Sequence, residues 1–252
     1  MTYRRTLLAL TVGLILPIVH ALTAQQFAGR NTYVIVHGAW GGAYGWRAVS
    51  DLLTANGHVV FRPTLTGLGE RAHLSSPEIG LETHITDVMN VILYENLQDV
   101  TLVGHSYGGM VVTAVADRLP DRIAHLAYID AFLPENGENL ITLRKATGRQ
   151  LPGEIRGAFV VPTWVKPGTP TPTNVPQPLK TFTDPILLKN PSRERIPTTY
   201  VLTMDPGAVN DEFDMFATRA KEKKWLVRRL TADHNPQRSA PKELSALLEQ
   251  VR

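Results

Sequence analysis

A serine flanked by glycines is the strongest chemical signal in the sequence. Ser106 lies in the run Gly-His-Ser-Tyr-Gly-Gly of residues 104–109, between an apolar stretch typical of a strand (100–103) and a helical pattern (110–119). A serine on a tight strand-to-helix turn projects its hydroxyl clear of a sheet, and the flanking glycines allow backbone to approach closely. The positive N-terminal end of the following helix favours developing negative charge. The pattern predicts that Ser106 is a nucleophile.

A serine hydroxyl becomes an effective nucleophile only when a base takes its proton. The chain has eight histidines, and His234 is the favoured one because it follows the last predicted strand, in the loop of residues 231–235. His37 and His105 adjoin the glycine motifs, and we expect them to be structural or to line the site. We therefore predict His234 as the general base.

The base needs a carboxylate that fixes its tautomer and stabilises the imidazolium. Asp205 follows the predicted strand 198–203 and gives the chain order Ser, Asp, His. Asp130, at the end of an earlier strand, is a competitor, and Asp211 and Asp233 are weaker candidates. We predict Asp205, with Asp130 as the alternative.

Two main-chain N–H groups must also face the oxyanion of such a reaction. One is expected from Tyr107, directly after the nucleophile, and the other from Ala39, in the loop after the first predicted strand. Gly38 would let this loop approach the substrate. Aromatic residues near the predicted mouth could line an apolar pocket or belong to the core; with Gly38, the favoured substrate-binding residues are Trp40, Phe132 and Trp164.

Elements that could position these residues alternate along the chain. Predicted strands cover residues 33–37, 59–61, 100–103, 123–129, 198–203 and 225–230, and predicted helices cover 44–56, 81–97, 110–119, 211–223 and 241–251. This alternation predicts an α/β fold with a mostly parallel central sheet flanked by helices. Residues 131–195 are rich in proline and break the pattern, so we expect an inserted cap or lid. The expected core is then residues 25–130 and 196–252.

Composition narrows the classes of function. The chain of 252 residues is 43% hydrophobic, and its net charge is only +3 with no dominant basic stripe, which gives a nucleic-acid role little support. With no cysteine, thiol catalysis, disulfides and cysteine-based metal sites are excluded. We expect neither a metal nor an organic cofactor.

The first residues resemble a targeting segment. Arg4 and Arg5 precede an apolar run over 7–19, and small residues then offer cleavage after Ala21 or Ala24. That order is typical of a secretory signal peptide, so residues 1–24 are set apart from the fold and the mature chain is expected to be secreted or periplasmic. The run is short and interrupted by proline, which argues against a membrane span. No stable membrane insertion is expected after processing, and a retained amphipathic or membrane-anchoring helix is the alternative. A homodimer is possible.

The chain resembles the α/β-hydrolase superfamily, and most of all its branch of plant methylesterases, hydroxynitrile lyases and bacterial esterase relatives. The resemblance is carried by Val-Ile-Val-His-Gly-Ala-Trp (34–40), Leu-Thr-Gly-Leu-Gly-Glu-Arg (65–71), Val-Gly-His-Ser-Tyr-Gly-Gly (103–109), Asp-Ala-Phe-Leu-Pro (130–134) and the pair Asp205 and His234. It implies a serine hydrolase that forms an acyl-enzyme intermediate and cleaves carboxylic esters of small to medium, partly apolar substrates.

Three positions depart from the lyases of that branch, which carry threonine at Gly38, glutamate at His105 and lysine at Asn235. Ester hydrolysis is therefore favoured over cyanohydrin cleavage. Lactone or thioester hydrolysis, a lyase-like activity and a non-catalytic ligand-binding role remain alternatives.

Overall fold

The computed structural model describes residues 29–208 and 211–251. The chain divides into two compact units, residues 1–30 and residues 31–252, and the description below concerns the second. The predicted signal peptide, residues 1–24, lies outside the described residues. Within the described part of the chain, no helix combines the length and apolar character needed to cross a membrane.

A six-stranded sheet forms the centre of this unit, in the order β2-β1-β3-β4-β8-β9, and every neighbouring pair is parallel. The strands are β1 (Thr32–Val36), β2 (Val59–Phe61), β3 (Val100–His105), β4 (Ile123–Ile129), β8 (Thr198–Met204) and β9 (Leu226–Thr231). Each predicted strand is present within a residue or two of its expected ends. The predicted α/β class with a mostly parallel sheet is confirmed.

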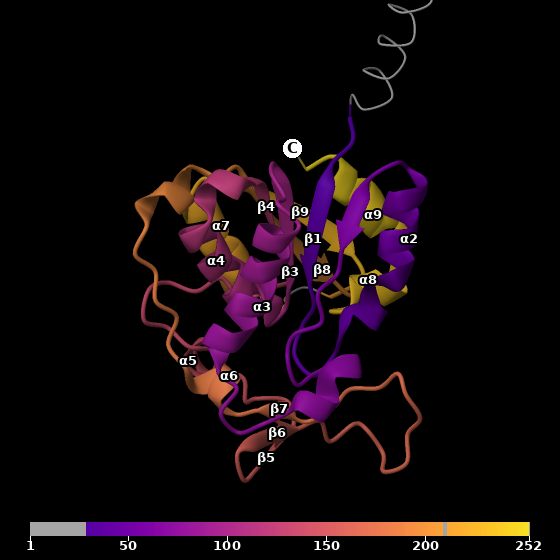
Figure 1. The fold of residues 1–252 in the computed structure, drawn as a ribbon, viewed down its shortest axis with the longest axis vertical. Coiled ribbons are helices and arrows are strands. Elements are labelled where there is room, and N and C mark those ends of the chain that lie inside the picture. The colour runs from indigo at the N-terminus through magenta and orange to yellow at the C-terminus, as the bar shows by residue number, and fades with distance from the viewer. Residues whose placement is uncertain (1–28, 209–210, 252) are drawn as a thin grey trace, which may run out of the picture. The chain divides into compact units, whose positions relative to one another are not determined.

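Helices cover both faces of the sheet, with α3, α4 and α7 on one face and α2, α8 and α9 on the other (Figure 1). Side chains alternate along a strand, so β1 sends Val34 and Val36 into the core beneath α3 and α4, and Tyr33 and Ile35 into the core beneath α2 and α9. The elements outside the cap are η1 (Ala43–Trp46), α2 (Arg47–Ala55), η2 (Gly69–Leu74), α3 (Leu81–Tyr94), α4 (Gly108–Arg118), η3 (Pro120–Arg122), α7 (Asp214–Glu222), α8 (Pro236–Ser239) and α9 (Pro241–Glu249).

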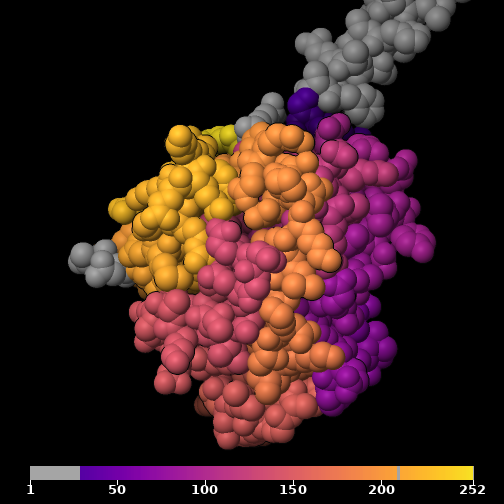
Figure 2. All heavy atoms as spheres, turned by 90° about the vertical axis from the view of Figure 1, so that its left-hand side faces the viewer, coloured from indigo at the N-terminus to yellow at the C-terminus, as the bar shows by residue number. Residues whose placement is uncertain are grey.

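The segment between β4 and β8 is more ordered than its prolines suggest. It contains α5 (Leu140–Ala146), β5 (Glu154–Arg156), β6 (Phe159–Val161), β7 (Gln177–Pro178), α6 (Lys180–Thr183) and η4 (Pro191–Arg195). Strands β5, β6 and β7 form a small antiparallel sheet at one end of the central sheet (Figure 1). In the space-filling view, the rose-to-orange atoms of this segment pack against the violet and gold parts of the core (Figure 2). We call residues 131–195 the cap; its movement as a lid stays a prediction.

Candidate functional site

The turn that carries Ser106 has the strained geometry expected of it. Ser106 follows β3 directly and adopts φ +51°, in the left-handed region that non-glycine residues rarely occupy. A Cβ on Gly104 would come within 2.5 Å of a Val112 methyl carbon, and one on Gly108 within 2.6 Å of the Val36 carbonyl oxygen. Only glycine therefore fits at either position, and α4 starts immediately behind the serine.

Ser106 and His234 meet although 128 residues separate them in the chain. The Ser106 Oγ lies 3.0 Å from His234 Nε2, within hydrogen-bond reach of a nucleophile and its base. His234 lies between β9 and α8, and its side chain is about one third exposed. Because Nδ1 of the same ring donates to a carboxylate, Nε2 is free to accept the serine proton.

That carboxylate belongs to Asp130. Its Oδ2 lies 2.6 Å from His234 Nδ1, and its Oδ1 accepts the backbone N–H of Thr203 at 3.0 Å. Asp130 is fully buried, directly follows β4 and has φ +44°. Its side chain is thus held from both ends, between β8 and the histidine.

The prediction that Asp205 fills this place is wrong. Asp205 is exposed and begins a turn beyond β8. The strand register explains the difference: Ile129 pairs with Val201, so Asp130 is level with Leu202 and Asp205 lies three residues farther out. At ~3.3 Å per residue, that places Asp205 about 10 Å beyond the level of Asp130. The carboxylate that contacts His234 is therefore the alternative, Asp130.

Two rings pack against the imidazole of His234. Phe213 stacks on it with 4.9 Å between ring centroids and 12° between planes, and His105 lies 4.9 Å away at 37°. The His105 Nε2–H also donates to the His234 carbonyl oxygen at 2.7 Å. Burial lowers the pKa of His105 to about 3, so this ring is neutral at ordinary pH.

The loop after β1 is fixed by contacts to both the core and the cap. His37 Nδ1–H donates to the Gly38 carbonyl at 2.7 Å, and its Nε2 accepts the Leu65 N–H at 3.1 Å. Burial lowers the pKa of His37 to about 4, which keeps it neutral in this role. Beyond Ala39, the Trp40 N–H donates to the buried Gln177 side chain of β7 at 2.8 Å. The cap therefore holds the loop that carries the candidate oxyanion amide.

A second buried histidine supports the other candidate amide. The Tyr107 hydroxyl donates to His84 Nδ1 at 2.8 Å, and His84 Nε2–H donates to the Thr66 carbonyl at 3.0 Å. Burial lowers the pKa of His84 to about 4. Tyr107 is therefore anchored to α3 through its side chain.

Ser106 and His234 line one cavity of about 490 Å³, a size suited to a small organic ligand. Besides Ser106 and His234, its lining includes all of the predicted oxyanion and substrate-binding residues: Gly38, Ala39, Trp40, Tyr107, Phe132 and Trp164. Trp40 and Trp164 meet edge to face with 5.1 Å between centroids. The structure brings these residues together as expected, and their individual roles stay predictions.

The cap and the core also meet in an ion pair at this cavity. Arg144 of α5 donates to Glu212 at 2.9 Å, and both side chains are mostly buried. The second Glu212 oxygen lies 3.4 Å from Arg149 Nε. Glu212 thus pairs with two arginines. The nearby wall of the cavity, formed by Phe132, Leu140 and Leu151, is apolar.

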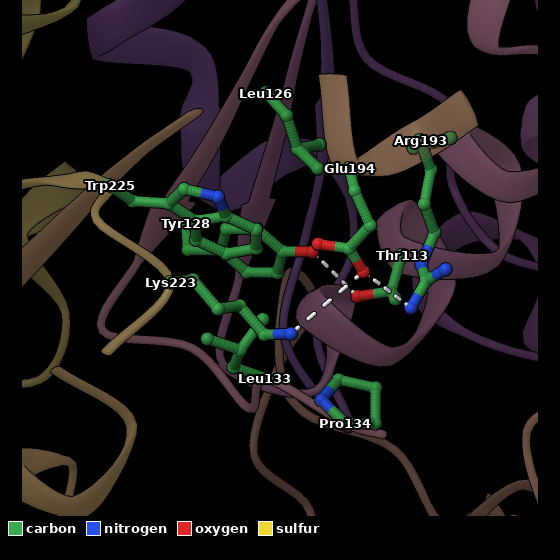
Figure 3. A pocket seen from close by; sticks show the side chains of 10 residues that line it. Thr113, Leu126, Tyr128, Leu133, Pro134, Arg193, Glu194, Lys223 and Trp225 are labelled. Carbon is green, nitrogen blue, oxygen red and sulfur yellow. Dashed lines mark hydrogen bonds and ion pairs between the residues drawn. The ribbon is translucent and has the colours of Figure 1, made fainter. Parts of the chain in front are cut away.

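A second hollow, separate from this cavity, is far smaller (Figure 3). It measures about 10 Å³ and lies beside Tyr128, Glu194 and Trp225. Its polar groups pair with one another: the Tyr128 and Thr113 hydroxyls lie 2.7 Å apart, and Glu194 contacts Lys223. It is too small for an organic substrate and holds none of the predicted site residues.

Sequence reasoning missed Phe213, Gln177 and His84. Their roles depend on contacts across 21 to 137 residues, and no local pattern marks such contacts. Among residues 29–208 and 211–251, the histidines and acids form no cluster of three or more that could hold a metal ion.

Comparisons with known proteins agree with this architecture. Residues 33–247 match the model of the Alpha/beta hydrolase family. The carbendazim hydrolyzing esterase of Nocardioides sp. (strain SG-4G) is 50% identical over 128 residues, covering 51% of this chain and 52% of that protein. Methylesterase 8 of Arabidopsis thaliana is 25% identical over 237 residues, covering 86% and 87%.

Among solved structures, the Arabidopsis methylesterase MES16 aligns with a TM-score of 0.69 at 24% identity, covering 87% of this chain and 98% of that one, and supports the fold. The match to the Nocardioides esterase spans about half the length of either protein. Because the family model extends from β1 to α9 and the fold agrees, the chain belongs to the alpha/beta hydrolase family.

Proposed function

We propose that this protein is a serine hydrolase that cleaves carboxylic esters of small to medium, partly apolar substrates. The observation that carries the proposal is the continuous chain of contacts from Ser106 Oγ through His234 to Asp130, at 3.0 and 2.6 Å. The serine end of this chain opens into the 490 Å³ cavity. This arrangement supports a nucleophile, a base and an orienting acid that act where a substrate can enter.

In the proposed reaction, Ser106 Oγ attacks the ester carbonyl carbon while His234 Nε2 takes the hydroxyl proton. The N–H groups of Ala39 and Tyr107 would stabilise the oxyanion of the tetrahedral intermediate. His234 then gives its proton to the departing alkoxide, which leaves an acyl-serine and a free alcohol. Water, deprotonated by the same histidine, attacks the acyl group and releases the acid and Ser106. Asp130 stabilises the imidazolium in both halves.

The lining of the cavity supports an ester with an apolar portion. Trp40, Phe132, Trp164 and Phe182 offer aromatic surface, which suits an aromatic or branched acyl or alcohol group. The names of the similar proteins point the same way, since one is an esterase that hydrolyses carbendazim and another is a methylesterase.

Steady-state kinetics on the purified protein test the proposal. The panel comprises p-nitrophenyl esters of increasing acyl length, methyl esters of aromatic acids, and carbendazim. Ser106→Ala is expected to lose at least ~10³-fold in kcat, whereas Ser75→Ala, at an exposed serine, keeps it. A fluorophosphonate probe should add one equivalent at Ser106. Labelling at another residue, or no hydrolysis anywhere in the panel, contradicts the proposal.

We also propose that the enzyme is exported, on the basis of the basic, apolar and small residues that follow one another in 1–24. Expression of the full chain in a bacterial host, followed by fractionation and intact-mass measurement, tests this. The expected product lies outside the cytoplasm and begins at Leu22 or Gln25. A cytoplasmic protein that keeps its first residues contradicts it.

A further inference from the structure

A small chamber adjoins the main cavity at His105. It measures about 40 Å³ and shares Gly38, Ala39 and His105 with the main cavity. A space that holds one water needs only ~10–15 Å³ measured in this way. The chamber is therefore large enough to hold water.

Three residues that line this chamber each carry a buried polar atom with no hydrogen-bond partner among the described residues: Trp46 Nε1, His105 Nδ1 and Gln237 Oε1. Their side chains are 1%, 3% and 5% exposed. Buried polar atoms in native proteins are nearly always paired, because an unpaired one costs ~1–3 kcal/mol. Three such atoms around one chamber point to a shared ligand.

The chemistry of these atoms specifies that ligand. The indole nitrogen of Trp46 can only donate. His105 already donates through Nε2–H to the His234 carbonyl, so its Nδ1 carries a lone pair and can only accept. Gln237 Nε2 donates to Asn235 Oδ1 at 3.3 Å, which leaves Oε1 as an acceptor. The ligand must accept one hydrogen bond and donate two.

Water has this pattern, whereas the common small ions do not. Chloride could accept from Trp46 but donates nothing, and ammonium could donate but accepts nothing. We propose that the chamber binds a water molecule that accepts from Trp46 Nε1–H and donates to His105 Nδ1 and Gln237 Oε1. The rings of Trp46 and His105 meet edge to face with 5.8 Å between centroids, so the two residues are direct neighbours in the wall of the chamber.

This water connects to catalysis through His105. The same imidazole that accepts from the water donates to the His234 carbonyl and packs against the His234 ring. His105 is therefore a positioning residue: the water fixes its orientation, and it in turn fixes the segment that carries the base. This second step rests on the proposed function, whereas the water site itself does not.

Water occupancy is measurable without any activity. In ¹⁵N-labelled wild-type protein, the four indole N–H signals are resolved and the Trp46 signal is assigned by its loss in Trp46→Phe. We expect a cross-peak between this N–H and a long-lived water in water-selective NOE and ROE spectra. A crystal structure at about 1.5 Å should show the same water bonded to all three atoms. A Trp46 N–H without a water contact overturns the site.

Kinetics test the link to His234. Trp46→Phe removes the donor among the three unpaired atoms, and we expect kcat to fall about two- to fivefold with KM unchanged. Trp225→Phe, a matched change at the small hollow of Figure 3, should leave kcat unaltered. If Trp46→Phe does not fold, Gln237→Met takes its place. An unchanged kcat, or an equal loss in the Trp225 variant, overturns the positioning role even while ester hydrolysis by the wild type stands.

Discussion

The ends of β4 and β8 are alike in sequence and opposite in structure. Each strand is followed almost at once by an aspartate, Asp130 after Ile129 and Asp205 after Met204. Asp130 is fully buried and has hydrogen bonds to His234 and to the Thr203 backbone. Asp205 is exposed and leads into a turn through Pro206 and Gly207. The comparison shows that an acid at a strand end acts on the site only if its strand stops at the right level.

The sharpest test exchanges each carboxylate for its amide. Asp130→Asn keeps the shape of the side chain but removes the charge that holds His234 Nδ1–H, so kcat is expected to fall about 10³- to 10⁴-fold. Asp205→Asn should stay within about twofold of wild type. Hydrolysis of a p-nitrophenyl ester measures both, and circular dichroism controls for folding. If the Asp205 variant has the larger loss, the comparison is reversed.

The difference between the two strand ends also marks what the sequence can predict. The sheet, its flanking helices and the Ser106 turn follow from local patterns: apolar runs, helical spacing, and glycines at 104 and 108 where a Cβ would collide. His234 followed from its place after the last strand. Both aspartates satisfy the chain order Ser, Asp, His equally well, so only the register of Ile129 with Val201 separates them.

Contacts with the cap were beyond the reach of local patterns for the same reason. Gln177 meets the Trp40 N–H across 137 residues, and nothing in the proline-rich sequence around it marks a buried side chain. Proline content indicated irregular backbone, yet β5, β6 and β7 pair there. Pairing between distant segments depends on tertiary packing, which outweighs local propensity in short strands.

The histidines, like the two aspartates, differ in burial. Protein stability at acid pH should show which of them are buried. Burial lowers the pKa of His84 to about 4 from 6.5, so between these values the unfolded chain binds a proton that the folded chain does not. Stability contributed by this site is therefore complete above pH 6.5 and decreases as pH falls toward 4.

His84→Gln should remove this dependence. Between pH 7 and pH 5, the free energy of unfolding of the variant is expected to fall by about 2 kcal/mol less than that of wild type, since 1.5 units of pH at ~1.36 kcal/mol each are no longer lost. Urea denaturation at the two pH values measures the difference. His73→Gln, at an exposed histidine, is the matched control, and an identical change in both variants would contradict the assignment.

Asp130 holds one nitrogen of His234 through a charged hydrogen bond, and Phe213 holds the imidazole by stacking on it. Phe213→Leu preserves an apolar side chain but removes the stacked ring, and a loss of ~0.5–1.5 kcal/mol in aromatic contact corresponds to about a two- to tenfold fall in kcat. Phe216→Leu, equally buried on α7 and packed on Phe132 and Phe213, is the control. Equal losses in the two would mean that general packing, not the stacking on the base, is what matters.

Trp164 does not fit the contrast between buried and exposed side chains. It is 50% exposed and yet lines the cavity. Its edge-to-face contact with Trp40 places one side of the indole against the site, so Trp164→Ala is expected to raise KM about two- to fivefold for an aromatic ester. A smaller effect is expected for an acetyl ester, which covers less of the wall. Tyr94→Ala removes another exposed aromatic side chain, at the end of α3, and should change neither KM. If the wild type and Trp164→Ala have equal KM values on both esters, Trp164 does not contact the substrate. Like Asp205, it would then be a residue that the sequence pattern assigned to the site wrongly.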